Sequence, residues 1–284
     1  MKRAALLLLT AVPAAVAAAA AVYLFGLAPS DPDGSESPKP PSRQSSASAR
    51  GLDAPAKKEL AQEIVASAEN STLDWRSAYG YIEDIGDGRG YTAGVIGFCT
   101  GTHDLLTLVE RYTKDHPGNG LARYLPALRT VDGTDSHAGL GPAFTAAWRA
   151  EARVAAFRAA QDAERDRVYF DPAVRLARHD GLGALGQFIY YDAIVVHGPG
   201  TDPHSFQGIR ARALREADTP AEGGSETTYL DVFLDVRRTV MKSEKSHHDT
   251  TRIDTAQRRF LHDGNLDLHT PLEWQVYGET YRVP

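Results

Sequence analysis

One glycine-rich segment constrains the fold of this 284-residue chain more than any other. Residues 86–90 read Gly-Asp-Gly-Arg-Gly, and β-branched and aromatic residues flank this run on both sides, at 79–85 and at 91–98. Glycine clusters between such residues are typical of turns that join short strands. The segment therefore predicts a short hairpin or a small sheet near the start of the folded part.

Helical patterning dominates the rest of the sequence. Asp53 and Pro55 form a helix start, and residues 57–69 continue with apolar residues at helical spacing. The same spacing recurs at 104–112, 148–167, 182–196, 228–245 and 255–263, without an internal repeat. Mostly helices with one small β element predict an α+β fold that is mainly α.

The first fifty residues are predicted to lie outside this fold. Residues 1–28 begin with a basic pair and continue as a long apolar run, which is typical of a signal peptide or a signal anchor. Alanines within the run offer cleavage sites, so we favour cleavage and release over a retained anchor. Residues 29–50 are rich in Pro, Ser and charge and predict a disordered linker. The folded domain then spans 51–284.

The charge balance argues against nucleic acid as a partner. The chain has 31 basic and 37 acidic residues, of which five and three lie in the first fifty. Residues 51–284 therefore hold 26 basic against 34 acidic residues, a net charge of −8. An acidic surface favours a cationic partner, although solubility alone is the alternative explanation.

Several reactive-site motifs are absent or incomplete. The glycine run lacks the G-x-G-x-x-G spacing of a nucleotide site, the ten histidines lack a zinc-ligand spacing, and no G-x-S-x-G element is present. Cys99 is the single cysteine, which excludes an intrachain disulfide and, without an activating partner, indicates a buried inert thiol. The sequence thus predicts neither a cofactor nor a metal.

Two carboxylates near the start of the domain remain as catalytic candidates. Glu69 ends an apolar helical stripe that contains Ala61 and Val65, and Asp87 lies in the glycine run. Glycoside hydrolysis needs one carboxyl group that stays protonated, which apolar surroundings favour, and one that stays ionised in polar surroundings. Lysozyme divides the two roles in this way. The alternative is that Glu69 is a solvated helix end and Asp87 only serves a turn.

Longer motifs carry a resemblance that covers residues 51–281. The motifs include SAENS at 67–71, YIEDIGDGRGYT at 81–92, ERDRVYFDP at 164–172, YYDAI at 190–194 and HGPG at 197–200. Together they resemble the bacterial chitosanases of glycoside hydrolase family 46. The resemblance implies a lysozyme-like fold of two lobes, with a small β-hairpin or sheet beside a substrate cleft. It also implies endo-hydrolysis of the β-1,4 links of chitosan with inversion. We expect the protein to be a monomer.

The resemblance assigns roles to residues by position. It implies that Glu69 is the general acid, that Asp87 is the general base, and that Thr92 holds the attacking water. The implied substrate contacts are Tyr81, Arg89, Asp104, His197 and Glu244, with Glu83 and Asp84 as further anionic candidates, and the implied supporting network is Asp192, Arg237 and Arg252.

Some positions are interpreted differently or depart from the family pattern. Trp75, Trp148 and Trp274 match family positions, and we expect them to pack in the core. His103 stands where a small residue is common, next to Asp104, and His247 and His248 stand where family members often carry acidic residues.

Two other hypotheses remain open from the sequence. One is a lysozyme-like muramidase, which uses the same paired carboxylates but would be repelled by anionic cell walls. The other is a non-catalytic module that binds chitosan, which would be expected to lack the intact pair. We expect an extracellular, secreted protein, tethered to the membrane only if residues 1–28 are retained.

Overall fold

The computed structural model describes residues 51–243 and 249–284. The predictions for residues 1–28 and 29–50, and those for Glu244, His247 and His248, lie outside the described residues. Within the described part, no helix combines the length and apolar character that a membrane span requires.

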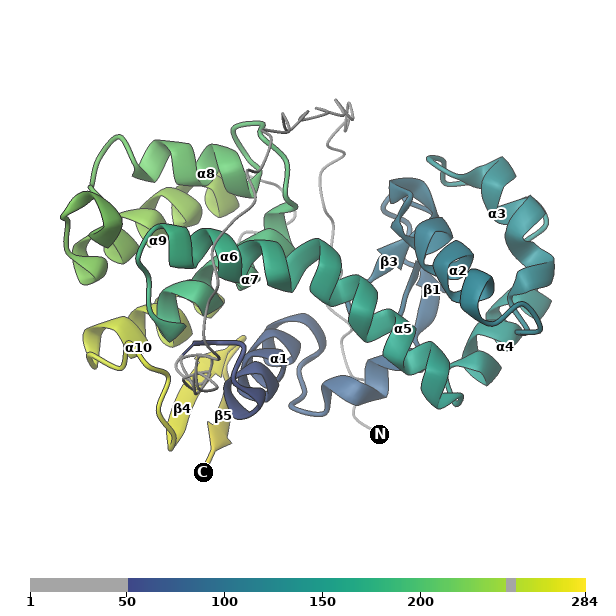
Figure 1. Ribbon diagram of the computed structural model, residues 1–284, viewed down its shortest axis with the longest axis horizontal. Coiled ribbons are helices and arrows are strands. Elements are labelled where there is room, and N and C mark those ends of the chain that lie inside the picture. The colour runs from purple at the N-terminus through teal and green to yellow at the C-terminus, as the bar shows by residue number, and fades with distance from the viewer. Residues whose placement is uncertain (1–50, 244–248) are drawn as a thin grey trace, which may run out of the picture.

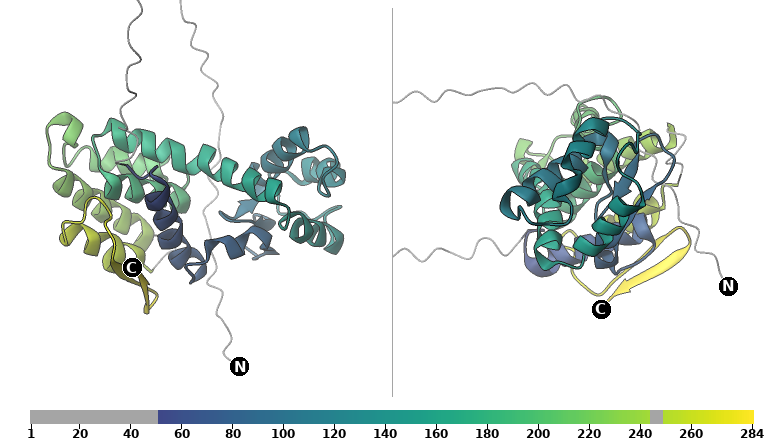
Figure 2. Two further views of the ribbon diagram at one scale, coloured as in Figure 1. Left: turned by 60° about the horizontal axis from the view of Figure 1, so that its bottom comes forward. Right: turned by 90° about the vertical axis from the view of Figure 1, so that its right-hand side faces the viewer.

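Two separate hydrophobic clusters divide the described chain into two lobes (Figure 1). The large-lobe cluster draws on α1 (Pro55–Asn70) and on residues from Phe170 to Val276, whereas the small-lobe cluster draws mainly on residues 75–157. A continuous helical path joins the lobes, running from α5 (Ala155–Arg165) through a π-helical segment (Asp166–Phe170) into α6 (Asp171–His179). Figure 2 shows this path spanning the molecule. The predicted mainly α, two-lobed fold is confirmed.

The small lobe contains the predicted β element, but as three strands. β1 (Ile82–Asp84), β2 (Tyr91–Ala93) and β3 (Phe98–Cys99) form an antiparallel sheet in that order. Thr92 pairs with both Glu83 and Cys99, so it occupies the middle of the sheet. The other small-lobe elements are η2 (Trp75–Gly80), η3 (Thr100–Thr102), α2 (Asp104–Asp115), η4 (Ala122–Tyr124), α3 (Leu125–Val131) and α4 (Pro142–Glu151).

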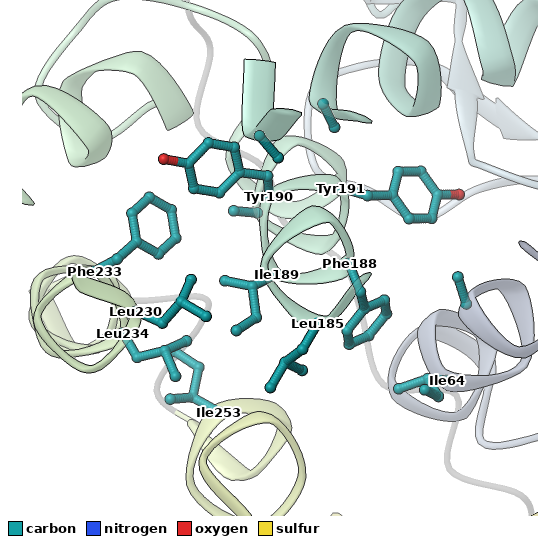
Figure 3. Packing of buried hydrophobic residues seen from close by; sticks show 14 of the residues in the cluster. Ile64, Leu185, Phe188, Ile189, Tyr190, Tyr191, Leu230, Phe233, Leu234 and Ile253 are labelled. Atoms are coloured by element: carbon teal, nitrogen blue, oxygen red, sulfur yellow. The ribbon is translucent and has the colours of Figure 1, made fainter. Parts of the chain in front are cut away.

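The large lobe is organised around α7 (Ala184–His197), which is buried along most of its length. Figure 3 shows Phe188 directed towards Ile64 of α1 and Ile189 directed towards Leu230 and Leu234 of α9 (Glu226–Ser243). Because α7 is mostly apolar around its circumference and buried on nearly all sides, other elements must surround it. The remaining large-lobe elements are α8 (Phe206–Ala213), η6 (Pro220–Glu222), the π-helical η7 (Arg252–Gln257), α10 (Arg258–His262), β4 (Leu272–Val276) and β5 (Glu279–Val283).

Two features differ from the sequence expectation. The helix predicted over 148–167 is broken between α4 and α5, where the Nη1 of Arg158 donates to the carbonyls of Ala152 and Arg153. The β4–β5 hairpin was not predicted; its turn residues Tyr277 and Gly278 both have positive φ, 52° and 80°. A two-residue turn with positive φ at both positions fits the twist of a hairpin. Its usual sequence signal is Asn-Gly, whereas this chain has Tyr-Gly, so the hairpin was missed.

The three tryptophans pack in the interior as expected. Trp148 and Trp274 are fully buried, and Trp75 is 8% exposed. Their indole N–H groups donate to the Tyr79 carbonyl, the Ser67 hydroxyl and the Glu59 carboxylate respectively.

Candidate active site

Glu69 lies in the last turn of α1, at the end of the predicted stripe whose members Ala61 and Val65 are buried. Its side chain is only 10% exposed, and its Oε1 lies 2.7 Å from the Nη2 of Arg252. The apolar surroundings expected from the stripe are therefore incomplete, because a guanidinium borders the carboxyl group. The stripe could not reveal this neighbour, which comes from η7, more than 180 residues further along the chain.

Behind Glu69 lies a buried charged network in the large lobe. The two oxygens of Asp192 on α7 contact the Nη2 of Arg252 at 2.8 Å and the Nη1 of Arg237 at 2.7 Å. Gln257 completes it by donating to Asp192 Oδ2 at 2.6 Å. Burial by itself would raise the pKa of Asp192, but the two guanidinium groups outweigh it and lower the pKa to about 2. Asp192 is thus held ionised between two arginines.

His197, the last residue of α7, is connected to the same network. Its Nε2 accepts a hydrogen bond from the Nε of Arg237 at 3.3 Å. Arg237 is fully buried and its other nitrogens donate to Gln257 and to the Asp192 backbone carbonyl. The orientation of the His197 ring is therefore tied to the network that supports Glu69.

Asp87 lies on the other lobe, in the loop between β1 and β2. Its Oδ1 accepts the Arg89 backbone N–H at 3.0 Å, and its Oδ2 accepts the Arg89 Nε at 2.7 Å. The Nη2 of Arg89 is 2.5 Å from the same oxygen, and the Asp87 side chain is 1% exposed. The structure thus places Asp87 in the expected loop, but clamped by Arg89 and covered rather than open to solvent.

Positive φ angles shape this loop. Gly86, Gly88 and Gly90 have φ of 73°, 81° and 69°, which is the left-handed region that favours glycine. At Gly90 a Cβ atom would also lie 2.2 Å from the Thr100 hydroxyl. That hydroxyl accepts the Tyr91 N–H, so the glycine permits the bond that anchors the loop to the start of η3.

Thr92 is buried in the middle of the sheet, where its hydroxyl lies 3.3 Å from the Cys99 sulfur. The Cys99 S–H also lies within hydrogen-bond distance of the Gly97 carbonyl oxygen, at 3.1 Å. Burial raises the pKa of the Cys99 thiol. Cys99 is thus buried, as expected, and its sulfur contacts the Thr92 hydroxyl.

Asp104 begins α2, and its Oδ1 accepts from the Thr102 hydroxyl at 2.7 Å and from the Cys99 and Leu105 N–H groups at 2.8 and 3.0 Å. Burial raises the pKa of Asp104 to about 6, against the effect of these donors. Tyr169 lies in the π-helical segment between the lobes. Burial raises the pKa of its hydroxyl, and the negative charge of Asp104 raises this pKa further.

The remaining small-lobe candidates lie around the sheet. The Tyr81 hydroxyl donates to Glu83 at 3.4 Å, and burial, with Glu83 beside it, raises the pKa of Tyr81 to about 12. Asp84 lies 3.3 Å from His137. His103 is directed towards Asp132, with its Nδ1 2.7 Å from Oδ2.

The candidates thus form two groups, one on each lobe. Glu69, Asp192, Arg237, Arg252 and His197 gather in the large lobe. The second group, on the small-lobe sheet and its loops, comprises Tyr81, Asp87, Arg89, Thr92 and Asp104. In the described chain, no hydrogen bond or ion pair joins Glu69 directly to Asp87.

Three residues near these groups were not singled out from the sequence. Gln257 and Tyr169 lie in π-helical segments, which often occur at functional sites. Tyr277 lies in the β4–β5 turn, where burial raises its pKa, the Arg252 charge opposes the rise and the Glu69 charge adds to it. The π-helical geometry that brings Gln257 and Tyr169 into place has no sequence signal of its own.

Comparison with known proteins gives a consistent result. The profile of glycosyl hydrolase family 46 matches residues 63–272. A chitosanase from Streptomyces sp. (strain N174) is 62% identical over 233 residues, covering 82% of this chain and 84% of that one. A chitosanase from Nocardioides sp. (strain N106) is 54% identical over 276 residues, covering 97% and 94%.

Solved structures show the same likeness. A co-crystal structure of a chitosanase with substrate matches with a TM-score of 0.80 and 58% identity, covering 82% of this chain and 99% of that one. The complex of a Gynuella sunshinyii chitosanase with chitotetraose matches with a TM-score of 0.73 and 33% identity, covering 80% and 97%.

The buried network predicts how stability depends on pH. Because the pKa of Asp192 is lowered to about 2, its contribution is present above about pH 4 and is lost as pH falls from about 4 to about 2. Over this window we expect wild type to lose about 2 kcal/mol that Asp192→Asn does not lose. At pH 7 the variant should be about 3–5 kcal/mol less stable, because two buried guanidinium groups lose their carboxylate.

Urea unfolding at pH 7, 4 and 2.5 measures both effects. Asp235→Asn is the matched control, since its exposed carboxylate pairs with Arg258 at the surface and should contribute less than about 1 kcal/mol. Equal losses in the two variants would contradict a buried, structural role for Asp192.

Proposed function

The chain belongs to glycosyl hydrolase family 46, and we propose that it is a secreted, endo-acting chitosanase that cleaves the β-1,4 links of chitosan with inversion. The profile match spans most of the folded domain, and the curated relatives that it resembles are chitosanases. Two of the solved neighbours were determined with substrate or with chitotetraose. Secretion is inferred from the composition of residues 1–28.

One observation carries the catalytic part of the proposal. Two largely buried carboxylates, Glu69 and Asp87, come from different lobes, and each lies against an arginine of its own lobe. An inverting glycosidase needs two carboxyl groups that face each other across the sugar, about 6.5–9.5 Å apart, with water between one of them and the anomeric carbon. Placing them on separate lobes leaves room for both the sugar and the water.

In the proposed reaction, Glu69 is the general acid. It transfers its proton to the oxygen of the glycosidic bond as the bond from that oxygen to the anomeric carbon breaks. The carboxylate that remains lies 2.7 Å from the Arg252 guanidinium, which stabilises the developing negative charge. Because Asp192 shares the same guanidinium, the arginine is held in place before the reaction begins.

Asp87 is the proposed general base, and Thr92 the residue that orients the water. Asp87 accepts a proton from water as the water oxygen bonds to the anomeric carbon from the opposite face. The contact with the Cys99 sulfur holds the Thr92 hydroxyl in place, and its oxygen lone pairs accept a hydrogen bond from that water. A water that donates its two protons to these two acceptors keeps its lone pairs free, and one of them can be directed at the anomeric carbon.

Charge supports a cationic polysaccharide as the substrate. Residues 51–284 carry a net charge of −8. Asp104 supplies a carboxylate on the small lobe, and Glu83 and Asp84 are exposed on β1. Such groups attract protonated glucosamine and discriminate against the neutral acetylated sugar. The same charge disfavours an anionic peptidoglycan substrate.

Loss of either carboxylate should nearly abolish turnover. We expect Glu69→Gln and Asp87→Asn each to lower kcat on chitosan by about 10²–10⁴-fold, because each removes one proton-transfer step. The measurement is the viscosity drop of a chitosan solution together with the release of reducing ends. A rapid viscosity drop at low product yield identifies endo cleavage.

Glu63→Gln is the matched control, since Glu63 is a partly exposed carboxylate on the same helix. It should retain wild-type turnover, and circular dichroism should show that all three variants fold. Full activity in either Glu69→Gln or Asp87→Asn would overturn the catalytic assignment. A folded wild type that degrades peptidoglycan but not chitosan would favour the muramidase.

The stereochemical outcome tests the water-mediated mechanism separately. Inversion of a β-1,4 link gives a product whose new reducing end is initially the α-anomer. Proton NMR during the first minutes of hydrolysis distinguishes the two anomers before mutarotation. An initial β-anomer would show a retaining enzyme instead.

The contribution of Asp104 should depend on pH. Because burial raises the pKa of Asp104 to about 6, its carboxylate is mostly charged above that pH and mostly neutral at pH 5. We expect Asp104→Asn to raise KM for chitosan at pH 6.5 much more than at pH 5. The readout is the ratio of variant to wild-type KM at each pH, which cancels the titration of the substrate amines. A ratio that does not change with pH would contradict a charge-based contact.

A further inference from the structure

A pocket lies on the small lobe, and its lining residues differ from those of the proposed active site. It has a volume of about 490 Å³ and is lined by Arg76, Tyr79, Gly80, Arg149, Ala152, Arg153 and Arg158. We call these residues the arginine pocket. Its volume falls within the usual range of small-molecule sites, and its lining contains four arginines and no acidic residue.

The arginine pocket is distinct from the proposed catalytic groups. It is formed by η2, the last turn of α4 with the bend that follows, and the first turn of α5. None of the residues assigned to catalysis or to chitosan lines it. Four guanidinium groups would also repel a polycation, so the pocket is unsuited to the proposed substrate.

Two of the arginines are held in place by neutral partners. The Nη2 of Arg149 donates to the Ile82 carbonyl at 3.1 Å, and the Nη1 of Arg158 donates to the carbonyls of Ala152 and Arg153 at 3.1 and 2.8 Å. These contacts orient the guanidinium groups without neutralising their charge. Each group also keeps further N–H donors for a ligand.

Arg153, the third arginine of the pocket, has no carboxylate partner in the described chain either. Within residues 51–243 and 249–284, no ion pair involves Arg149, Arg153 or Arg158, although most arginines in the same region pair with Asp or Glu. Arg76 differs, because both of its terminal nitrogens contact Glu59. Three uncompensated positive charges thus converge on one pocket in a protein that is acidic overall.

We propose that the arginine pocket binds an anion that carries a phosphate group. Planar guanidinium groups present paired N–H donors that match the oxygens of phosphate, and several of them around one pocket can share a doubly charged group. The space exceeds what a bare phosphate ion fills. Tyr79, Gly80 and Ala152 supply an uncharged wall against which a body of about the size of a monosaccharide fits.

Arg153 is the variant that tests the proposal most directly. Its side chain is exposed and makes no hydrogen bond or ion pair in the described chain, so Arg153→Gln should fold normally. Arg175→Gln is the matched control: Arg175 is an exposed arginine of α6, it lies outside the pocket, and its loss changes the net charge equally. Arg153→Lys keeps the charge but removes the fork of donors.

The experiment titrates the full-length protein with inorganic phosphate at constant ionic strength, with chloride as the balancing anion, by calorimetry and by thermal shift. We expect one saturable site and a rise in Tm in wild type. The affinity should fall at least about tenfold in Arg153→Gln, fall less in Arg153→Lys, and stay unchanged in Arg175→Gln.

A second titration with glucose 6-phosphate identifies the source of the phosphate. Tighter binding than that of inorganic phosphate assigns the pocket to a sugar phosphate, whereas equal affinity assigns it to free phosphate. The proposal fails if wild type shows no saturable binding, if chloride alone has the same effect, or if Arg153→Gln and Arg175→Gln lose the same affinity. None of these outcomes depends on chitosan hydrolysis.

Discussion

The contact between Arg252 and two carboxylates is the interaction on which the arrangement of the large-lobe group depends. One nitrogen of its guanidinium lies 2.8 Å from Asp192, deep in the lobe, and 2.7 Å from Glu69, at the end of α1. A buried guanidinium without such partners would be strongly unfavourable, so α1, α7 and η7 must meet where these three groups can touch. Arg237 and Gln257 satisfy the remaining oxygen of Asp192 and make the arrangement rigid. The position of the proposed acid is therefore set by the core of its own lobe.

In the small lobe, the carboxylate of Asp87 is positioned by interactions between residues that are close in the sequence. Asp87 is held by the backbone and side chain of Arg89, two residues later, within a loop whose glycines adopt left-handed φ. Thr100 anchors that loop by accepting the Tyr91 N–H, and Cys99 fixes the Thr92 hydroxyl in the adjoining strand. No long-range ion pair is needed, because the sheet itself brings these groups together.

This contrast explains how much of the site could be predicted from the sequence. The glycine run and its flanking strands indicated where Asp87 and the sheet would lie, since the relevant interactions are local. The helical stripe placed Glu69 correctly at a helix end, but its arginine neighbour lies in η7 and is brought near only by tertiary packing. The resemblance to family 46 named Asp192, Arg237 and Arg252, whereas Gln257 joins them through π-helical geometry that has no periodic signal. The bend between α4 and α5 also escaped prediction, because residues 148–167 favour helix throughout.

Since each lobe fixes its own carboxylate, the separation between Glu69 and Asp87 must be set by the segments that connect the lobes. These are the passage from α1 into η2 and the path from α5 to α6, and they are tied to each other. The Nζ of Lys58 on α1 lies 2.6 Å from Asp166 in the π-helical segment, and the Tyr79 hydroxyl of η2 donates to Asp162 of α5 at 2.7 Å. Glu59 of α1 accepts the Trp75 indole N–H at 3.0 Å. An inverting mechanism tolerates only a limited range of carboxyl separations. The contacts between the two connections therefore hold the separation of the two carboxylates that the proposed reaction requires. None of the residues in these connections needs to touch the substrate.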